Sequence, residues 1–514
     1  MSISRLYQNT IKILWAFFLI SLPVTSFPFL PAELGGKTQV RPLAMYPLLI
    51  LLILITIPRF FKKPLPLTFL PLFAFIAAVF ISSTLSFSME IGALKGVSVL
   101  ARIVRSVITL GIGVSFYLTV VLYQRSEKDL NFSLRWLYIG FIALLLWGSV
   151  QAIYIIHFNQ AFFNLLNKIQ SLISTQNLYT TRISGFTYEP KWFAEQITFL
   201  LMPWLAASVI AGRSVFKWHY RWITIEWVLL VWSAIILVFT FSRTGLVVLV
   251  LLTFVGVLFS RSFHMDKPHH STKSTPAGRP PLRWLRWLEA GLAALALTGI
   301  LIFAGSRNPY FSRLWRYWSD EKASGKSYLQ YIAFGQRFAY AETAFYIFED
   351  HPIFGVGLGN YAFFFNQALP NQPWQNSPEI IRQITPTERG TQLITPKNLY
   401  ARLLAETGLV GTLIFTTFVL AILGCSLYLF FIPLRAGRFW GLAGLLGLFV
   451  FATVVFSTDS FAVPNMWVVF GFITAAAYLP EFSSAPRDLP EAGGASPAQD
   501  KSIPAQDTGL ITSI

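Results

Sequence analysis

The sequence contains 514 residues, of which 54% are apolar and only 12% are charged. A soluble domain carries about 25% charged residues, so this composition excludes a set of soluble domains, a disordered chain and a collagen-like repeat. Apolar stretches of membrane-spanning length, at about 20 residues each, occupy roughly half of the chain. The composition therefore predicts an all-α polytopic membrane protein.

The charge and the metal-ligating residues narrow the chemistry further. Lys and Arg number 40 against 23 Asp and Glu, a formal charge of +17. In a soluble protein, this excess of basic residues suggests a nucleic-acid partner. In a membrane protein, the preference of Lys and Arg for cytoplasmic loops is the simpler explanation of the excess. We therefore expect no nucleic-acid partner. The single cysteine, Cys425, excludes an intrachain disulfide and a Cys-based metal site. Because the six histidines show no metal-ligand spacing either, we expect neither a metal nor a cofactor.

Hydropathy predicts about twelve transmembrane helices when the chain is read against a hydrocarbon core of about 30 Å. The expected spans are 8–31, 42–58, 65–85, 99–123, 134–157, 192–212, 222–241, 244–262, 284–305, 408–432, 438–457 and 462–480. We expect the first to be a retained helix rather than a signal peptide, because prolines crowd its end and no A-x-A cleavage site follows.

Basic residues gather in alternate loops and predict the orientation. The short loops on one side hold 21 of the 40 Lys and Arg, so both termini should be cytoplasmic. We divide the chain into a transmembrane domain at 1–480, a long extracytoplasmic loop within it at 306–397, and a cytoplasmic tail at 481–514. The composition of the tail, rich in Pro, Ala, Ser and Gly, predicts disorder. Residues 263–283 form a basic, Pro-rich cytoplasmic loop.

The long loop before the tenth span contains the most informative local patterns. Residues 335–350 place aromatic side chains on one stripe at helical spacing, which predicts an amphipathic helix along the membrane surface in contact with membrane lipids. A second amphipathic helix is expected at 397–407. The glycines at 355, 357 and 359 follow a proline rather than a strand, so they do not form a dinucleotide loop. Two interpretations of these glycines remain open: a plain turn, and a turn whose backbone amides face an anion.

Four cations from separate loops fall on the predicted extracytoplasmic face: Arg182, Arg243, Arg337 and Lys397. The ordinary explanation for Arg182 and Glu189 is an ion pair in a solvated loop, and that for Arg243 is a cation whose side chain reaches the membrane interface. The alternative is that these cations bind one anion together. Guanidinium groups bind phosphate bidentately and keep their charge, so such a cluster suits a lipid pyrophosphate and would stabilise the charge on it as a glycosidic bond breaks.

Four motifs together resemble the O-antigen ligase/polymerase superfamily of bacterial inner-membrane proteins over roughly residues 60–480. They are TRISGFTYEP at 181–190, FTFSRTG at 239–245, the stretch from Gln336 through HPIFGVGLGN, and KNLYARLLAETGLVG at 397–411. The resemblance implies a C-class glycosyltransferase fold in the bacterial inner membrane. It also implies metal-independent, inverting transfer from an undecaprenyl-pyrophosphate-linked glycan donor to a glycan or lipid acceptor.

The resemblance assigns the two arginines Arg182 and Arg243 to the pyrophosphate. The ligase pattern at the last motif begins with histidine, whereas this chain has Lys397 before Asn398. A lysine acts as a base only with a strongly lowered pKa and is otherwise a fixed cation. This departure favours a polymerase over a ligase for lipid A core. If a base is needed, Glu189 is the first candidate and Glu406 the second.

The sequence therefore predicts a polysaccharide polymerase or ligase. One alternative is a transporter or flippase for an anion or a lipid-linked sugar, which would place charges near the middle of the spans. Another is a non-catalytic partner in a polysaccharide assembly.

Overall fold

The fold is known from a computed structural model that describes residues 3–29, 39–216, 218–221, 223–264, 283–321, 325, 327–332, 334–370, 378–385 and 393–483. Most of the predicted cytoplasmic loop at 263–283 lies outside the described residues. The predicted tail does so from residue 484 onward, while a short helix still covers residues 481–483.

The described chain is mostly helical. The helices are α1 (Ile3–Ser21), α2 (Met45–Leu51), η2 (Leu52–Thr56), α3 (Ile57–Phe60), α4 (Phe69–Leu85), η3 (Ser86–Met89), α5 (Val99–Tyr123), α6 (Glu127–Ile156), α7 (Gln160–Ile173), α8 (Pro190–Glu195), η4 (Gln196–Leu201), α9 (Met202–Ala211), α10 (Ile225–Phe239), α11 (Arg243–His264), α12 (Arg283–Ser306), α13 (Arg313–Arg316), α14 (Tyr328–Tyr331), α15 (Gly335–Asp350), α16 (Tyr361–Ala368), α17 (Pro378–Ile384), α18 (Leu399–Phe431), α19 (Arg435–Val454), α20 (Pro464–Ala477) and α21 (Pro480–Ser483). Two short strands, β1 (His219–Tyr220) and β2 (Ile223–Thr224), pair antiparallel.

Each of the twelve predicted spans overlaps a helix or a run of helices, although the first helix, α1, ends at Ser21, well before the predicted end of its span at 31. Among the described residues, seven of these are long and apolar enough to cross a membrane: 69–89, 99–123, 127–156, 190–211, 287–306, 399–431 and 435–454. Four shorter apolar helices, at 45–60, 225–239, 243–259 and 464–477, fall below that length. The helical membrane fold is thus confirmed, and the count of twelve stays a prediction.

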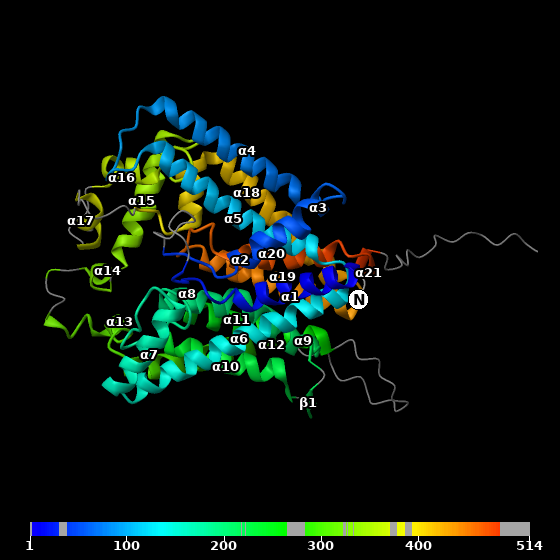
Figure 1. Ribbon diagram of the computed structural model, residues 1–514. Helices are drawn as coiled ribbons and strands as arrows, with labels where there is room; N and C mark the ends of the chain where they lie inside the picture. The colour runs from blue at the N-terminus through cyan, green and yellow to red at the C-terminus, as the bar shows by residue number, and fades with distance from the viewer. Residues whose placement is uncertain are drawn as a thin grey trace, which may run out of the picture.

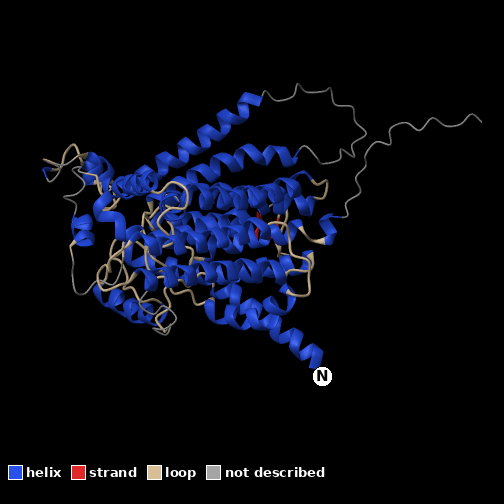
Figure 2. Cartoon of the chain, turned by 90° about the horizontal axis from the view of Figure 1, so that it is seen from above, coloured by secondary structure: helices blue, strands red, loops and turns tan. Residues whose placement is uncertain are grey.

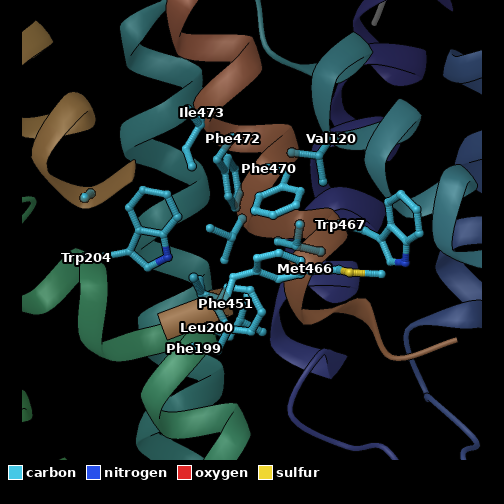
Figure 3. Close-up of a cluster of buried hydrophobic side chains, with 14 of the residues drawn as sticks. Val120, Phe199, Leu200, Trp204, Phe451, Met466, Trp467, Phe470, Phe472 and Ile473 are labelled. Carbon is cyan, nitrogen blue, oxygen red and sulfur yellow. The ribbon is translucent and has the colours of Figure 1, made fainter. Parts of the chain in front are cut away.

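The helix at the centre of the bundle is α20, and all of its 14 residues are buried. A helix that is apolar on every side belongs in a core, and the close-up in Figure 3 shows side chains of α20 packed against those of α5, α9, α19 and η4. Small residues bring α5 and α20 together, because a Cβ at Gly113 would lie 2.1 Å from the Trp467 ring and one at Gly471 would lie 2.8 Å from Val120.

One end of the bundle differs from the other. Figure 1 shows α7 and α13 to α17 together at one end of the long helices, opposite the N-terminus and β1, and Figure 2 shows the same separation from above. We call this end the loop end. Because α13 to α17 belong to the predicted long loop at 306–397, the loop end is the one that we expected to face the extracytoplasmic side.

Candidate functional site

The segment that carries Arg182 is fixed by the helices beneath it. The Gln151 side chain on α6 accepts hydrogen bonds from the Ser184 and Gly185 amides at 3.1 and 2.9 Å, and Gln170 on α7 donates to the Gly185 carbonyl at 3.1 Å. Gly185 has φ of +56°, and a Cβ there would lie 2.9 Å from Leu144 and Phe193. The chain therefore makes a tight turn at this position, and only glycine has room for it.

Arg182 and Arg243 meet on one tyrosine ring. The guanidinium carbon of Arg182 lies 4.0 Å from the centroid of Tyr310, and that of Arg243 lies 5.5 Å from the same centroid. The two charges are therefore no farther apart than the sum of these distances. Such cation–π contacts are worth about 0.5–2 kcal/mol each. Two arginines that the sequence places in different loops thus form one cationic site.

Tyr310 is placed by an asparagine turn. The Asn308 side chain accepts from the Tyr310 amide at 2.9 Å and donates to the Thr181 carbonyl at 2.8 Å. It therefore joins the segment after α12 to the segment that carries Arg182. Tyr179 also contacts Arg182, at 5.3 Å, and burial, followed by the charge of Glu189, raises its pKa to about 12. Tyr179 therefore remains a neutral partner for the cation at ordinary pH.

Arg243 retains unused hydrogen-bonding capacity. It is the first residue of α11, and its Nη1 donates to the Ile332 carbonyl at 2.9 Å, just before α15. Its Nε is buried and has no hydrogen-bond partner among the described residues. A buried donor without an acceptor is costly, so this side chain is suited to an added anionic acceptor.

Arg337 and Lys397 form the second part of the site. Arg337, on the first turn of α15, donates through Nη1 to the Lys397 carbonyl and to the Ser457 carbonyl, both at 3.5 Å. Lys397 has φ of +53°, which is unusual for a residue with a side chain, and its amide donates to Asp459 at 2.8 Å. Lys397 is therefore held in place by the turn between α19 and α20.

The ammonium group of Lys397 is ion-paired. It contacts Glu379 on α17 and lies 5.1 Å from the centroid of the Tyr340 ring. Tyr340 donates its hydroxyl to the same carboxylate at 2.9 Å. Burial raises the pKa of Glu379, but the opposing charge of Lys397 and the hydrogen bonds outweigh it, so the net pKa lies below the ordinary value. The carboxylate therefore stays ionised and pairs with the Lys397 side chain.

Ser457 connects the two parts. Its carbonyl accepts from Arg337 and also from the ammonium group of Lys191 on α8, and its hydroxyl accepts from Thr244, next to Arg243, at 3.4 Å. Lys191 is a fifth cation that the sequence did not single out. We call Arg182, Lys191, Arg243, Arg337 and Lys397 the cation cluster.

The three acid–base candidates lie in different surroundings. Glu189 directly precedes α8 and is partly exposed, with no ion pair among the described residues. Glu406 is fully buried and paired with Arg402 at 2.8 Å, and Arg402 also donates to the Asp459 carbonyl at 2.7 Å. Lys397 is occupied by Glu379. This geometry suits Glu406 to positioning Arg402 and the 455–463 turn, and suits Lys397 to the role of a fixed cation.

The glycine-rich stretch at 353–361 has a structural role. The amides of Val356 and Gly357 donate to the Ala405 and Glu406 carbonyls at 3.0 and 2.9 Å, and the Leu358 amide donates to Ser83. These amides bind α18 and α4, so they do not face an anion. Of the two possibilities that the sequence left open, the structure supports the plain turn.

Sequence reasoning missed Tyr310, Glu379 and the Ser457–Asp459 turn, because their importance arises from contacts between distant segments. One signal was present in the sequence: Lys191 and Glu195 are four residues apart at the start of an apolar span. In the part of the chain that the structure describes, no group of three His, Cys, Asp or Glu side chains is placed to hold a metal ion.

A family model described as O-Antigen ligase matches residues 228–416, which include Arg243, Arg337, Lys397 and Glu406. No curated protein matches the chain.

Proposed function

The chain belongs to the O-antigen ligase/polymerase superfamily, and from that premise we propose that the cation cluster binds the diphosphate of an undecaprenyl-pyrophosphate-linked glycan. The family implies a multi-pass membrane enzyme that transfers glycans from a lipid carrier to an acceptor. The finer proposal is a polysaccharide polymerase or ligase of the bacterial inner membrane that works at the extracytoplasmic face, with both termini in the cytoplasm.

One observation carries this proposal: Arg182 and Arg243 share the ring of Tyr310. Like charges brought together without an acid between them repel each other, and the pair is stabilised by an anion that both can contact. A diphosphate is such an anion. Arg337, Lys191 and Lys397, joined to this pair through Ser457, extend the positive surface over which a diphosphate chain can lie.

In the proposed reaction the cluster acts on the leaving group. An acceptor hydroxyl attacks the anomeric carbon from the face opposite the diphosphate, which inverts the configuration. The charge that develops on the departing diphosphate is held by preorganised guanidinium groups, and electrostatic stabilisation of this kind commonly contributes more to catalysis than any other single effect. In this proposal, protein cations supply the stabilisation without a metal.

Lys397 in place of the ligase histidine favours polymerisation of glycan units over ligation to lipid A core. Because Lys397 is ion-paired with Glu379, the role proposed for Lys397 is a contact to phosphate rather than that of a base. Glu189, partly exposed and seven residues after Arg182, remains the first candidate base from the sequence.

The test is an exchange of the two arginines in a strain that makes the polymer. We expect Arg182→Ala with Arg243→Ala to abolish polymer of normal chain length, and each single Arg→Lys exchange to reduce it, because lysine keeps the charge but not the bidentate geometry. Arg313→Ala, an exposed cation of α13 at the same end, is the control and should leave the polymer unchanged. A normal polymer with the double variant would contradict the proposal.

A further inference from the structure

Glu195 is a buried acid beneath the cation cluster that the proposed function has not used. It ends α8, within the apolar segment 190–211, and only 3% of its surface is exposed. Ionisable groups inside a membrane-spanning segment are costly and are found where function requires them. Its partner is Lys191, one turn earlier, whose Nζ lies 3.3 Å from Glu195 Oε1.

This ion pair leaves the carboxylate short of donors. Lys191 approaches Oε1 at the distance of an ion pair, and no other described residue donates a hydrogen bond to this oxygen. Buried polar oxygens almost always have a donor. Glu195 therefore has room for one more donor than the protein itself supplies.

A small, partly open cavity lies beside this carboxylate. It measures about 30 Å³ and is lined by Glu195, Asp459, Ser460 and Asn465 together with apolar residues such as Leu399 and Met466. Asn465 is 4% exposed, and its side-chain oxygen also has no donor among the described residues. A water needs about 10–15 Å³ by this measure. The space therefore fits a hydroxyl group rather than a sugar ring. Two of the residues that line it, Glu195 and Asn465, each have a buried oxygen without a donor among the described residues.

The backbone at this position is irregular. Directly after Glu195 the chain forms the π-helix η4, from Gln196 to Leu201. Such π-helical turns are rare and occur frequently at functional sites. The irregularity therefore begins next to the residue whose carboxylate lines the cavity.

The cavity adjoins the proposed diphosphate site. Lys191 donates to the Ser457 carbonyl, which also accepts from Arg337 at 3.5 Å, and the turn that follows Ser457 lines the cavity with Asp459. One turn of the chain thus separates the proposed anion-binding surface from a mostly apolar cavity that Glu195 and Asn465 help to line. A donor glycan held by its diphosphate would bring its anomeric carbon toward this boundary.

We propose that Glu195 is the catalytic base that accepts the proton of the acceptor hydroxyl, and that Lys191 is a positioning residue for it. This inference rests on the proposed function. As the hydroxyl oxygen bonds to the anomeric carbon, the bond from that carbon to the diphosphate oxygen breaks and the electron pair leaves with the diphosphate. The hydroxyl proton passes to the Glu195 carboxylate.

The other acids of the site are less suited to this step. Glu379 already accepts from Lys397 and Tyr340. Glu406 is paired with Arg402, and although its Oε1 also lacks a donor among the described residues, neither Glu379 nor Glu406 lines the cavity. Glu189 is partly exposed and does not line the cavity. It lies six positions before Glu195 in the same stretch of chain, so Glu189→Gln distinguishes the two candidate bases.

The experiment uses the full-length protein in lipid nanodiscs, with lipid-linked glycan extracted from the source strain as donor. We expect Glu195→Gln to lower the transfer rate at least ~100-fold, the usual scale of a lost general base. Binding of undecaprenyl pyrophosphate and the Tm should stay close to those of the wild type. Glu349→Gln, which removes an exposed carboxylate from α15, is the control and should retain transfer within a few-fold. Formate should partly restore transfer to Glu195→Ala but not to Arg243→Ala.

Three outcomes would overturn the inference. The first is near-normal transfer by Glu195→Gln, and the second is a large loss with Glu189→Gln instead. The third is a loss of undecaprenyl pyrophosphate binding or of Tm in Glu195→Gln, because that marks a structural ion pair. Failure of the proposed function looks different, since Arg182→Ala with Arg243→Ala would then bind undecaprenyl pyrophosphate normally.

Discussion

Tyr310 is the residue on which the two arginines depend for their common orientation. Its ring supplies a neutral, electron-rich face to Arg182 at 4.0 Å and to Arg243 at 5.5 Å. Aromatic faces attract guanidinium groups without neutralising them. An acid at this position would pair with the arginines and compete with a phosphate, whereas a tyrosine leaves their full charge available.

Two substitutions of Tyr310 distinguish the contribution of its ring from that of its hydroxyl group. We expect Tyr310→Phe to keep near-normal transfer, because the face of the ring remains. Tyr310→Leu loses both cation–π contacts, worth about 0.5–2 kcal/mol each, so transfer should fall by roughly tenfold or more. Transfer rates of the two purified variants are the measurement, and equal rates would show that the ring does not order the arginines.

The ionised carboxylate of Glu379 should make the stability of the site depend on pH. The pKa of its carboxyl is held below the ordinary value of 4.5 by Lys397, despite the opposing effect of burial. A lowered pKa means that its stabilisation is present above the unfolded pKa and is lost as the pH falls through the folded one. We therefore expect Glu379→Gln to lower the Tm at pH 7, with a difference that shrinks below about pH 4.

The control for this acid effect is Glu349→Gln, which removes an exposed carboxylate from α15 at the same end of the molecule. It should change the Tm little at either pH. A Tm difference for Glu379→Gln that is the same at both pH values would mean that the ion pair with Lys397 does not contribute.

At the level of elements, the break in α18 explains two glycine motifs at once. Gly408 has φ of +61° and ψ of −164° inside an otherwise helical run, and the amides of Leu409 and Val410 donate to the Pro352 and Ile353 carbonyls. The 351–360 stretch therefore completes the hydrogen bonding of the interrupted helix. This contact anchors the loop end to the bundle, and with it α15 and Arg337.

The break should not tolerate a side chain. A Cβ at Gly408 would lie 2.4 Å from the Ile353 carbonyl oxygen, so we expect Gly408→Ala to lower the Tm strongly and to abolish transfer. The matched control is Gly424→Ala in the same helix, where nothing lies within 4 Å of the added carbon. It should be neutral or slightly stabilising, because alanine is the better helix former. Equal Tm changes in the two variants would contradict this role for the break.

How far the sequence predicts these elements depends on how local their causes are. The helix expected at 335–350 agrees with α15, because a stripe at helical spacing and Pro352 are both visible in the sequence. Phe338 and Phe345 on that stripe are about half exposed, as a surface helix requires. By contrast, the use of the glycine-rich amides by α18 depends on the break at Gly408, which no local pattern shows.

At the level of the whole molecule, too, the sequence predicts features with local causes and misses those that arise from contacts between distant segments. Hydropathy found a helix at every expected span, since length and composition are sufficient for that inference. Arg182 and Arg243 were singled out by their place in loops on one predicted face and by the motifs, and the structure brings them together. Tyr310, Ser457 and Asp459 could not be recognised, because their roles arise only when the segment after α12, α15 and the α19–α20 turn meet.

The orientation of the molecule is open to a direct test, because Cys425 is the only cysteine in the chain. In a Cys425→Ser background, we expect Asp350→Cys at the loop end to react with a membrane-impermeant maleimide in intact cells. Lys128→Cys, at an exposed position in the first turn of α6, should react only after lysis. The reverse pattern would place the cation cluster on the cytoplasmic side and contradict the positive-inside assignment.

The central claim is that cations from separate loops hold one diphosphate. Its most direct test is the binding of undecaprenyl pyrophosphate to the full-length protein, compared with Arg182→Ala plus Arg243→Ala and with Arg313→Ala. Charge-assisted bonds to phosphate are worth about 1.5–3 kcal/mol each, so the double variant should bind roughly 100-fold more weakly or worse, and Arg313→Ala as tightly as the wild type. Equal affinity in all three proteins would contradict the account.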